Sequence, residues 1–195
     1  MDYGHTDRDG AGVASAKIII AGGFGSGKTT FVGTLSEIPP VRTEAMMTAA
    51  SIGVDETAAV PGKTSTTVAF DFGRITLSND LILYLFGTPG QHRFWFMWND
   101  LVQGAVGAVV LVDTRRLADC FGAIDFFEAR GLPFVVAINR FENTHAHPVE
   151  DVRAALALGS RVPIIACDAR SAQSAKHALI AATEHAMALL LETSG

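Results

Sequence analysis

Cysteine, charge and long apolar runs are all scarce in this chain of 195 residues. Its 2 cysteines, Cys120 and Cys167, are too few for a disulfide framework, so we expect a reducing compartment such as the cytoplasm. Charged residues make up 18% of the chain and the net charge is -5, which gives no electrostatic reason to bind nucleic acid. The longest apolar stretch, residues 105–112, is far below the roughly 20 residues that cross a bilayer, so we expect no direct membrane insertion.

The length is that of one ordinary domain, and 49% apolar residues are enough to build a full core. Residues 1–16 mix Asp, Arg, Gly and small residues without a period, so we expect a frayed tail before a domain over 17–195. The chain opens with Met1-Asp2 and closes without a terminal cysteine motif, so no lipid anchor is expected. Contact with a membrane would therefore need a partner.

Apolar runs bounded by turn residues predict strands, and most of these runs are too continuous to have a solvated face. The predicted strands span residues 18–21, 67–77, 81–86, 108–112, 134–138 and 164–167, and the predicted helices span 28–35, 117–130, 149–156 and 171–191. This pattern predicts an α/β fold with a mostly parallel sheet and helices on both faces. The turn Ser78-Asn79-Asp80 is too short for a crossover, so the second and third strands should form an antiparallel hairpin.

The strongest motif follows the first predicted strand and reads Gly22-Gly23-Phe24-Gly25-Ser26-Gly27-Lys28-Thr29, a full P-loop pattern between a strand and a helix. Gly25 and Gly27 let the backbone turn its N–H groups toward a phosphate, and the next helix directs its positive dipole end at the same anion. We expect Lys28 to reach the β- and γ-phosphates and the Thr29 hydroxyl to bind Mg²⁺. The predicted phosphate-binding residues are Gly22, Gly25, Ser26, Gly27, Lys28, Thr29 and Thr30. A glycine-rich turn without a ligand is the alternative, and the spacing argues against it.

Two segments are candidates for the second sequence element beside the metal ion of a P-loop protein. Residues 109–113, Val-Val-Leu-Val-Asp, resemble a Walker B strand, but Thr114 follows where many such ATPases carry a catalytic Glu. The third predicted strand instead leads into Gly87-Thr88-Pro89-Gly90-Gln91, which resembles the Asp-x-x-Gly-Gln element of Ras-like GTPases. That resemblance implies that the Gly90 amide senses the γ-phosphate and that Gln91 orients the attacking water.

The order of the elements also resembles a small GTPase more than a nucleotide kinase or a helicase-type ATPase. The family's switch threonine would be Thr67, with its hydroxyl on Mg²⁺, while Thr64 and Thr66 are rivals that the sequence leaves open. The resemblance implies a three-layer P-loop NTPase fold with six strands in the order 2-3-1-4-5-6, strand two antiparallel. It also implies hydrolysis of GTP with Lys28, Thr67 and Gln91 as catalytic residues.

A possible base-reading element follows the fifth predicted strand. Asn139-Arg140-Phe141-Glu142 resembles the guanine-reading Asn-Lys-x-Asp element with two replacements. Asn139 can serve the Hoogsteen edge, Glu142 can accept from the guanine N1–H and N2 amino group, and Arg140 can lay a cationic plane over the base. After the last strand, residues 167–170 are similar to a Ser-Ala-Lys loop, which implies that the Ala169 amide touches the guanine oxygen. A structural role for Asn139 at the strand end is the alternative.

Residues 86–101 and 112–120 make the resemblance more specific, because they look like the small GTPases of actinobacterial conservon operons. Those proteins are relatives of the bacterial gliding-motility (MglA-type) GTPases, and the similarity covers about residues 15–192. It implies a cytoplasmic GTP/GDP switch with Mg²⁺ that hydrolyses GTP slowly. It also implies two partners, a roadblock/LC7-family protein and a membrane histidine-kinase-like sensor that could recruit the switch.

The chain departs from that pattern at three positions. Gly87 replaces the Asp that holds Mg²⁺ through water, so the metal loses an outer carboxylate. Thr66 stands where gliding-type relatives carry an arginine finger, for which Arg42 or Arg93 could substitute after a loop movement. Glu142 is one methylene longer than the family's Asp. The first two departures favour the alternative of a non-hydrolysing, nucleotide-dependent scaffold. An ATP-using phosphotransferase is a second alternative, which the absence of an Arg-rich lid disfavours.

Five apolar residues in succession, Phe94-Trp95-Phe96-Met97-Trp98, follow the predicted switch glutamine. On a helix they would point in every direction, so one core face cannot bury them all. We expect two or three of them in the core. The remainder would form an apolar patch for a partner or for nucleotide-dependent self-association.

Overall fold

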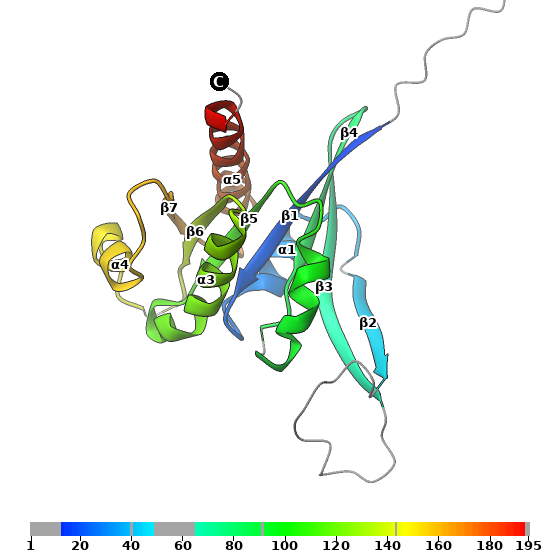
Figure 1. The fold of residues 1–195 in the computed structure, drawn as a ribbon, viewed down its shortest axis with the longest axis horizontal. Coiled ribbons are helices and arrows are strands. Elements are labelled where there is room, and N and C mark those ends of the chain that lie inside the picture. Colours follow the sequence, from blue (N-terminus) through cyan, green and yellow to red (C-terminus); the bar gives the residue numbers. More distant parts are fainter. Residues whose placement is uncertain (1–12, 40, 49–64, 91, 143, 194–195) are drawn as a thin grey trace, which may run out of the picture.

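The computed structural model describes residues 13–39, 41–48, 65–90, 92–142 and 144–193. One sheet of seven strands has the order β2-β3-β4-β1-β5-β6-β7 (Figure 1). The elements in chain order are β1 (Ala14–Gly22), α1 (Lys28–Leu35), β2 (Val41–Thr48), β3 (Ser65–Ser78), β4 (Leu81–Gly87), the 3₁₀ segment η2 (His92–Met97), α2 (Trp98–Leu101), β5 (Gly107–Val112), the 3₁₀ segment η3 (Thr114–Cys120), α3 (Phe121–Arg130), β6 (Phe134–Asn139), α4 (Val149–Ala155), β7 (Ile164–Cys167) and α5 (Ala172–Thr193).

The predicted order of six strands is confirmed, because it corresponds to β3-β4-β1-β5-β6-β7. From β4 through β7 the neighbouring strands are parallel, whereas β3 is antiparallel to β4 as the short hairpin turn requires. The seventh strand, β2, lies at the edge beside β3 and was not predicted. Its sequence, VRTEAMMT, lacks the long apolar run that is typical of a buried strand. An edge strand can form without one, because its backbone hydrogen bonds to one neighbour hold it in the sheet.

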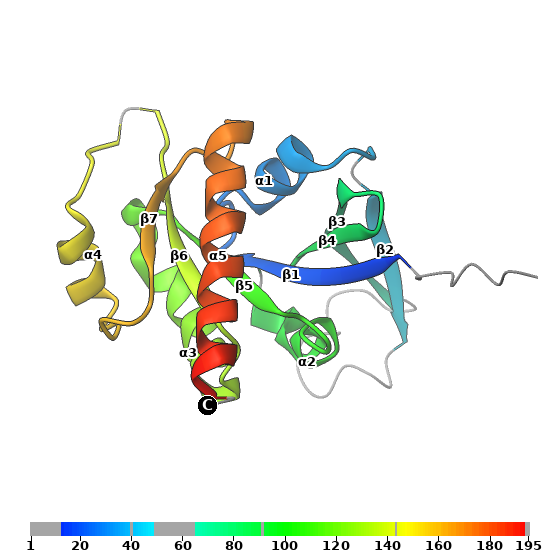
Figure 2. The same cartoon turned by 90° about the horizontal axis from the view of Figure 1, so that it is seen from above.

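Helices cover both faces of the sheet, as the sequence predicts. Along β1, Ile18 and Ile20 pack into a core with α1 and α5, whereas Ile19 and Ala21 pack into a second core with α2, α3 and α4. In Figure 2, α1 lies above β1 and α2 lies below it. The alternation follows from the period of two along a strand, which sends successive side chains to opposite faces.

Some element boundaries differ from the prediction. β1 spans Ala14–Gly22, so it is longer than the predicted strand 18–21 and includes residues 14–16 of the predicted tail 1–16, because its first residues pair with β4 from Leu81 onward. Residues 117–120 of the predicted helix 117–130 belong instead to the 3₁₀ segment η3, and α3 begins at Phe121. Within η3, Arg116 has a non-helical backbone (φ -145°, ψ 56°), and the Asp113 side chain caps the first turn by accepting from the Arg115 amide. Among the described residues, no helix is both long and apolar enough to span a membrane.

The aromatic block 94–98 divides between core and surface. Trp98 is 1% exposed and stacks with Phe127 of α3, whereas Phe96 is 42% exposed. Trp95 is partly buried, packs against Trp98 with ring centres 5.3 Å apart, and lies against Gly122 of α3, where a Cβ would overlap the edge of its indole. The segment after β4 is therefore anchored to α3 by two indoles, and Gly122 leaves the space that one of them needs.

Gly122→Ala tests this anchoring. Alanine favours a helix interior by about 1 kcal/mol over glycine, but the added methyl group overlaps Trp95, so we expect a net loss of about 1–3 kcal/mol in the free energy of unfolding. Urea denaturation followed by circular dichroism measures it. Gly159→Ala is the matched control, because a Cβ there meets open space and the change should stay within about 0.5 kcal/mol. A Gly122→Ala protein as stable as the wild type would contradict the described packing.

Candidate functional site

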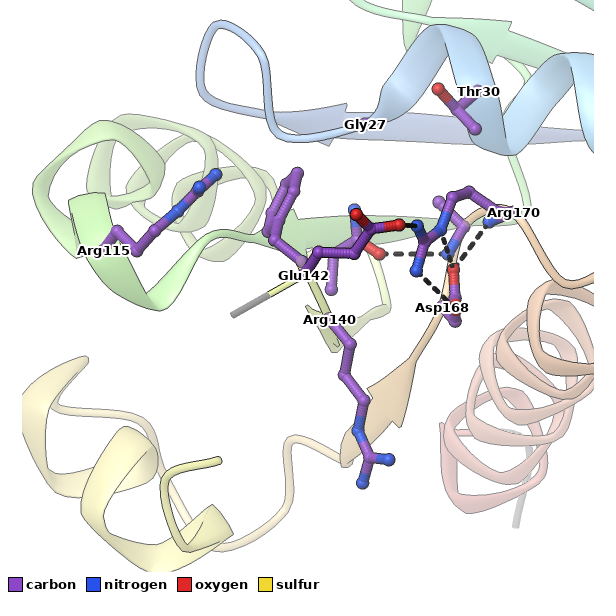
Figure 3. A pocket seen from close by; sticks show the side chains of 10 residues that line it. Gly27, Thr30, Arg115, Arg140, Glu142, Asp168 and Arg170 are labelled. Carbon is purple, nitrogen blue, oxygen red and sulfur yellow. Dashed lines mark hydrogen bonds and ion pairs between the residues drawn. The ribbon is translucent and has the colours of Figure 1, made fainter. Parts of the chain in front are cut away.

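Two cavities adjoin the ends of β1, β4, β6 and β7, at the carboxyl edge of the parallel strands where open α/β sheets bind ligands. The Lys28 cavity, of about 430 Å³, is lined by Phe24, Gly25, Gly27, Lys28, Thr29, Thr30, Phe70, Asp71, Thr88, Pro89 and Gly90. The Asn139 cavity, also about 430 Å³, is lined by Gly27, Thr30, Arg115, Asn139, Arg140, Phe141, Glu142, Asp168, Ala169 and Arg170 (Figure 3). Gly27 and Thr30 line both, so the two cavities are neighbours.

Glycine conformations shape the predicted phosphate loop. Gly25 and Gly27 have φ values of +74° and +105°, which side-chain-bearing residues rarely adopt. Gly22 lies so close to the Leu111 carbonyl that a Cβ would overlap it. α1 begins at Lys28 without a side-chain cap, which leaves the N–H groups of its first turn for an anion. The loop predicted from the sequence is therefore a cradle with its donors in place.

Lys28 lies inside this cradle. Its ammonium donates to the carbonyl oxygens of Gly22 (2.9 Å) and Gly23 (2.7 Å). Burial lowers the pKa of Lys28 from 10.5 to about 8, and the nearby Asp71 carboxylate opposes that shift. Gly90 closes over the same point, since a Cβ there would lie 2.9 Å from the Lys28 Nζ and 3.0 Å from the Phe24 backbone. The structure thus brings two predicted residues, Lys28 and Gly90, to one place.

A carboxylate that the sequence analysis missed lies beside Thr29. The Thr29 hydroxyl donates to Asp71 Oδ2 at 2.8 Å. Asp71 of β3 pairs in register with Gly87 of β4, and a Cβ on Gly87 would lie 2.9 Å from the Asp71 Cβ. The missing side chain at Gly87 is what lets Asp71 reach Thr29. The signal was visible in the sequence as a single Asp within the apolar strand segment 68–72.

These oxygen donors suit Mg²⁺. A threonine hydroxyl and a carboxylate are hard oxygen ligands, and a magnesium ion that keeps most of its waters needs few of them from the protein. Asp113, the competing Walker B residue, does not share this position. Both its carboxylate oxygens accept from Arg115, at 2.8 and 2.7 Å, and these bonds lower the pKa of Asp113. The Walker B interpretation of residues 109–113 therefore has no support in the geometry.

The η3 segment braces the outer side of the phosphate loop. Arg116 donates from Nη2 to the Phe24 carbonyl at 2.6 Å, and its guanidinium also lies near Asp113 and Asp119. Gly23 packs so tightly on Asp119 that a Cβ would overlap that side chain. The bond between Arg116 and Phe24 joins residues 92 positions apart in the chain, so no motif in the sequence indicated it.

Asn139 joins the phosphate loop to the loop after β7. Its buried amide donates from Nδ2 to the Ser26 carbonyl (2.9 Å) and accepts at Oδ1 from the Ala169 amide (3.0 Å). Two residues predicted to face a base, Asn139 and Ala169, therefore bond to each other. The structural role considered for Asn139 is present, and the amide retains one N–H and one lone pair for a ligand.

Figure 3 shows an ion-pair group at the open side of the Asn139 cavity. Arg170 donates from Nη1 to Glu142 Oε1 at 2.6 Å, and from Nε and Nη2 to Asp168 at 3.0 and 3.1 Å. Arg140, predicted to cover a base, extends away from this group. The Arg115 guanidinium instead lies 4.1 Å from the centre of the Phe141 ring, a stacked contact that the sequence did not indicate.

Other predicted residues cannot be placed at the site. Gln91 lies outside the described residues, as does Thr64. Thr67 belongs to β3 and pairs with Met46 of β2 through the backbone, but its side chain lies outside the description. The same holds for the side chains of Thr66, Arg42 and Arg93.

Residues 20–189 match the model of a family described as conserved hypothetical ATP binding proteins. The chain belongs to this family. A curated relative of the chain, uncharacterized protein MJ1339 of Methanocaldococcus jannaschii, is 29% identical over 126 residues, which cover 64% of this chain and 69% of the relative.

Solved structures show the same fold. The Arl6 small GTPase of Trypanosoma brucei, solved with the nucleotide analogue GppNp, has a TM-score of 0.62 and 14% identity over 89% of this chain and 98% of its own. The G domain of the T. maritima FeoB iron transporter has a TM-score of 0.58 and 14% identity over 89% of this chain and 99% of its own. The predicted fold of a P-loop NTPase with a Ras-like sheet is thus confirmed.

The lowered pKa of Lys28 predicts a pH dependence of stability. Between the folded pKa of about 8 and the ordinary 10.5, the unfolded chain binds more protons than the folded protein, so stability rises with pH in that window. From about pH 7 to about pH 9.5, the free energy of unfolding should rise by about 2 kcal/mol more in the wild type than in Lys28→Met. Urea titrations of both proteins measure this. Parallel pH profiles would show that Lys28 is solvated.

Proposed function

We propose that this protein is a GTP/GDP-binding molecular switch of the conservon type that uses Mg²⁺ and hydrolyses GTP slowly. The observation that carries the proposal is the bridge made by Asn139. Its hydrogen bonds to Ser26 and Ala169 hold a cradle for phosphates against a second cavity of the size and polarity for a base. A nucleoside phosphate is the ligand class that needs both.

Guanine is the base that the Asn139 cavity suits. The Glu142 carboxylate is an acceptor, and guanine offers donors at N1 and N2 where adenine offers an acceptor nitrogen at N1. The G domains that share this fold support the same choice. ATP is the second candidate, because the family's description names it.

Lys28, Thr29 and Asp71 would hold the phosphates and the metal. The metal, when bound, neutralises charge on the β- and γ-phosphate oxygens. Thr29 offers its hydroxyl as a ligand, and Asp71 takes the outer position left by Gly87. Thr67 and Gly90 would close over the γ-phosphate, and Gln91 would orient the attacking water.

Hydrolysis by the isolated protein should be slow. Lys28, the metal and Gln91 are the parts that unassisted small GTPases have, and an arginine finger adds about 10³–10⁵ in rate. Arg116 donates to the Phe24 carbonyl and lies near Asp113 and Asp119, so its guanidinium braces the phosphate loop. A non-hydrolysing scaffold and an ATP-using phosphotransferase are the competing proposals.

The proposed switch acts in the cytoplasm with a roadblock/LC7-family protein, and a histidine-kinase-like sensor could recruit it to the membrane. Two exposed aromatic side chains support a partner surface, Phe24 in the phosphate loop at 65% exposed and Phe96 of η2 at 42% exposed. Nucleotide-dependent self-association is the competing use of the same surface.

Calorimetric titration with GDP, GTP, ATP and XTP tests the function. We expect GDP and GTP to bind at least tenfold more tightly than ATP, a difference of about 1.4 kcal/mol, because Glu142 meets donors only in guanine. Lys28→Ala should greatly weaken GTP binding, whereas Lys176→Ala on α5 is the control. ATP binding as tightly as GTP would contradict the proposed preference for guanine.

The single-turnover rate of GTP hydrolysis by the wild type should be about 10⁻³ s⁻¹ or less. A single-turnover rate of about 1 s⁻¹ would contradict the proposal that the isolated protein lacks an arginine finger.

Asp71→Asn tests the metal position. The amide keeps the size of the side chain but loses its charge, so the Mg²⁺ concentration for half-maximal GTP binding should rise about 10–100-fold. Asp80→Asn, in the turn at the far end of β3, should leave it unchanged and is the matched control. An unaltered Mg²⁺ requirement in Asp71→Asn would remove this residue from the metal site.

A further inference from the structure

We propose that Arg170 is a specificity-determining positioning residue, which holds the Glu142 carboxylate in place to recognise the 2-amino group of guanine. This inference rests on the proposed function and deepens it. It assigns a role to a side chain in the loop that resembles Ser-Ala-Lys, where the resemblance implies a base contact by the Ala169 amide and none by Arg170.

The contacts of Arg170 span two loops that meet only in the folded protein. From the loop after β7, its Nη1 donates to Glu142 Oε1 in the loop after β6 at 2.6 Å. Its Nε and Nη2 donate to both carboxylate oxygens of Asp168, and its backbone N–H donates to Asp168 Oδ1 at 3.0 Å. The guanidinium is thus oriented by Asp168, and its planar fork leaves one end directed at Glu142 (Figure 3).

Burial cannot orient Glu142, because its side chain is 79% exposed. A glutamate has one more rotatable bond than an aspartate, so an unheld carboxylate at this position loses more conformational entropy when it binds a ligand. Asp168 lines the same cavity and carries the same charge, so without Arg170 the two carboxylates repel. Arg170 bonds to both, which removes the repulsion and orients the longer side chain.

The held carboxylate can still read a base. Glu142 Oε2 is left to accept, and Oε1 keeps a second lone pair beside the bond to Arg170. Guanine presents N1–H and the 2-amino group as adjacent donors, whereas hypoxanthine lacks the amino group. A carboxylate in a fixed position gains from both donors, and a mobile one loses most of that gain. Discrimination between GDP and IDP therefore reports on Arg170.

Titrations of GDP, IDP and ADP into wild type, Arg170→Ala and Arg170→Lys test this. In the wild type GDP should bind about tenfold more tightly than IDP, and in Arg170→Ala this ratio should fall to about two, through loss of GDP affinity. Arg170→Lys should be intermediate, because an ammonium cannot bond both carboxylates in the same fork. Arg161→Ala is the matched control, since Arg161 bonds to Glu192 of α5 and lines neither cavity.

A double-mutant cycle shows whether Arg170 acts through Glu142. In a Glu142→Ala background, Arg170→Ala should have no further effect on the GDP-to-IDP ratio. An unchanged ratio in Arg170→Ala, or a persistent effect in the Glu142→Ala background, would overturn the inference while leaving GDP binding intact. ADP binding as tightly as GDP in the wild type would instead overturn the proposed function. Thermal unfolding of each variant separates these outcomes from a loss of fold.

Discussion

The buried amide of Asn139 is the interaction on which the rest of the candidate site depends. It satisfies the Ser26 carbonyl on one side and the Ala169 amide on the other, and so it connects the phosphate loop, the end of β6 and the loop after β7. Separation of the two loops would leave buried polar groups without partners, at about 1–3 kcal/mol for each group, so the Asn139 amide stabilises the contact between the loops. One buried side chain thus ties the wall of the Asn139 cavity to the phosphate loop.

Charged residues on other elements lie beside two of the departures from the resembled motif, Gly87 and Glu142. Gly87 and Asp71 are neighbours on adjacent strands, and the absence of a side chain at Gly87 gives Asp71 the room to approach Thr29. In the Asn139 cavity, Arg170 joins Asp168 and Glu142, whose like charges would otherwise repel. In both places a position that departs from the resembled motif lies beside a charged residue from another element.

Patterns within short stretches of the chain predicted most of the helices and strands. α1 was predicted at 28–35 and observed there, and the six predicted strands have the expected order, because apolar runs and glycine punctuation are local properties. β2 was missed since an edge strand is held by backbone bonds to β3 and needs no apolar pattern. Residues 117–120 were predicted as part of an α-helix but form the end of the 3₁₀ segment η3, since an apolar pattern over one turn does not distinguish the two helix types.

The amino-acid sequence by itself determined the phosphate loop, the helices on both faces of a mostly parallel sheet, and the residue types available to read a base. Only the tertiary structure decided which carboxylate stands beside Thr29, what holds Glu142, and that Asn139 and Ala169 bond to each other. The physical reason is separation along the chain. A motif is made of neighbours, whereas each of these contacts joins residues from different strands and loops, and their distances exist only once the sheet has brought those elements together.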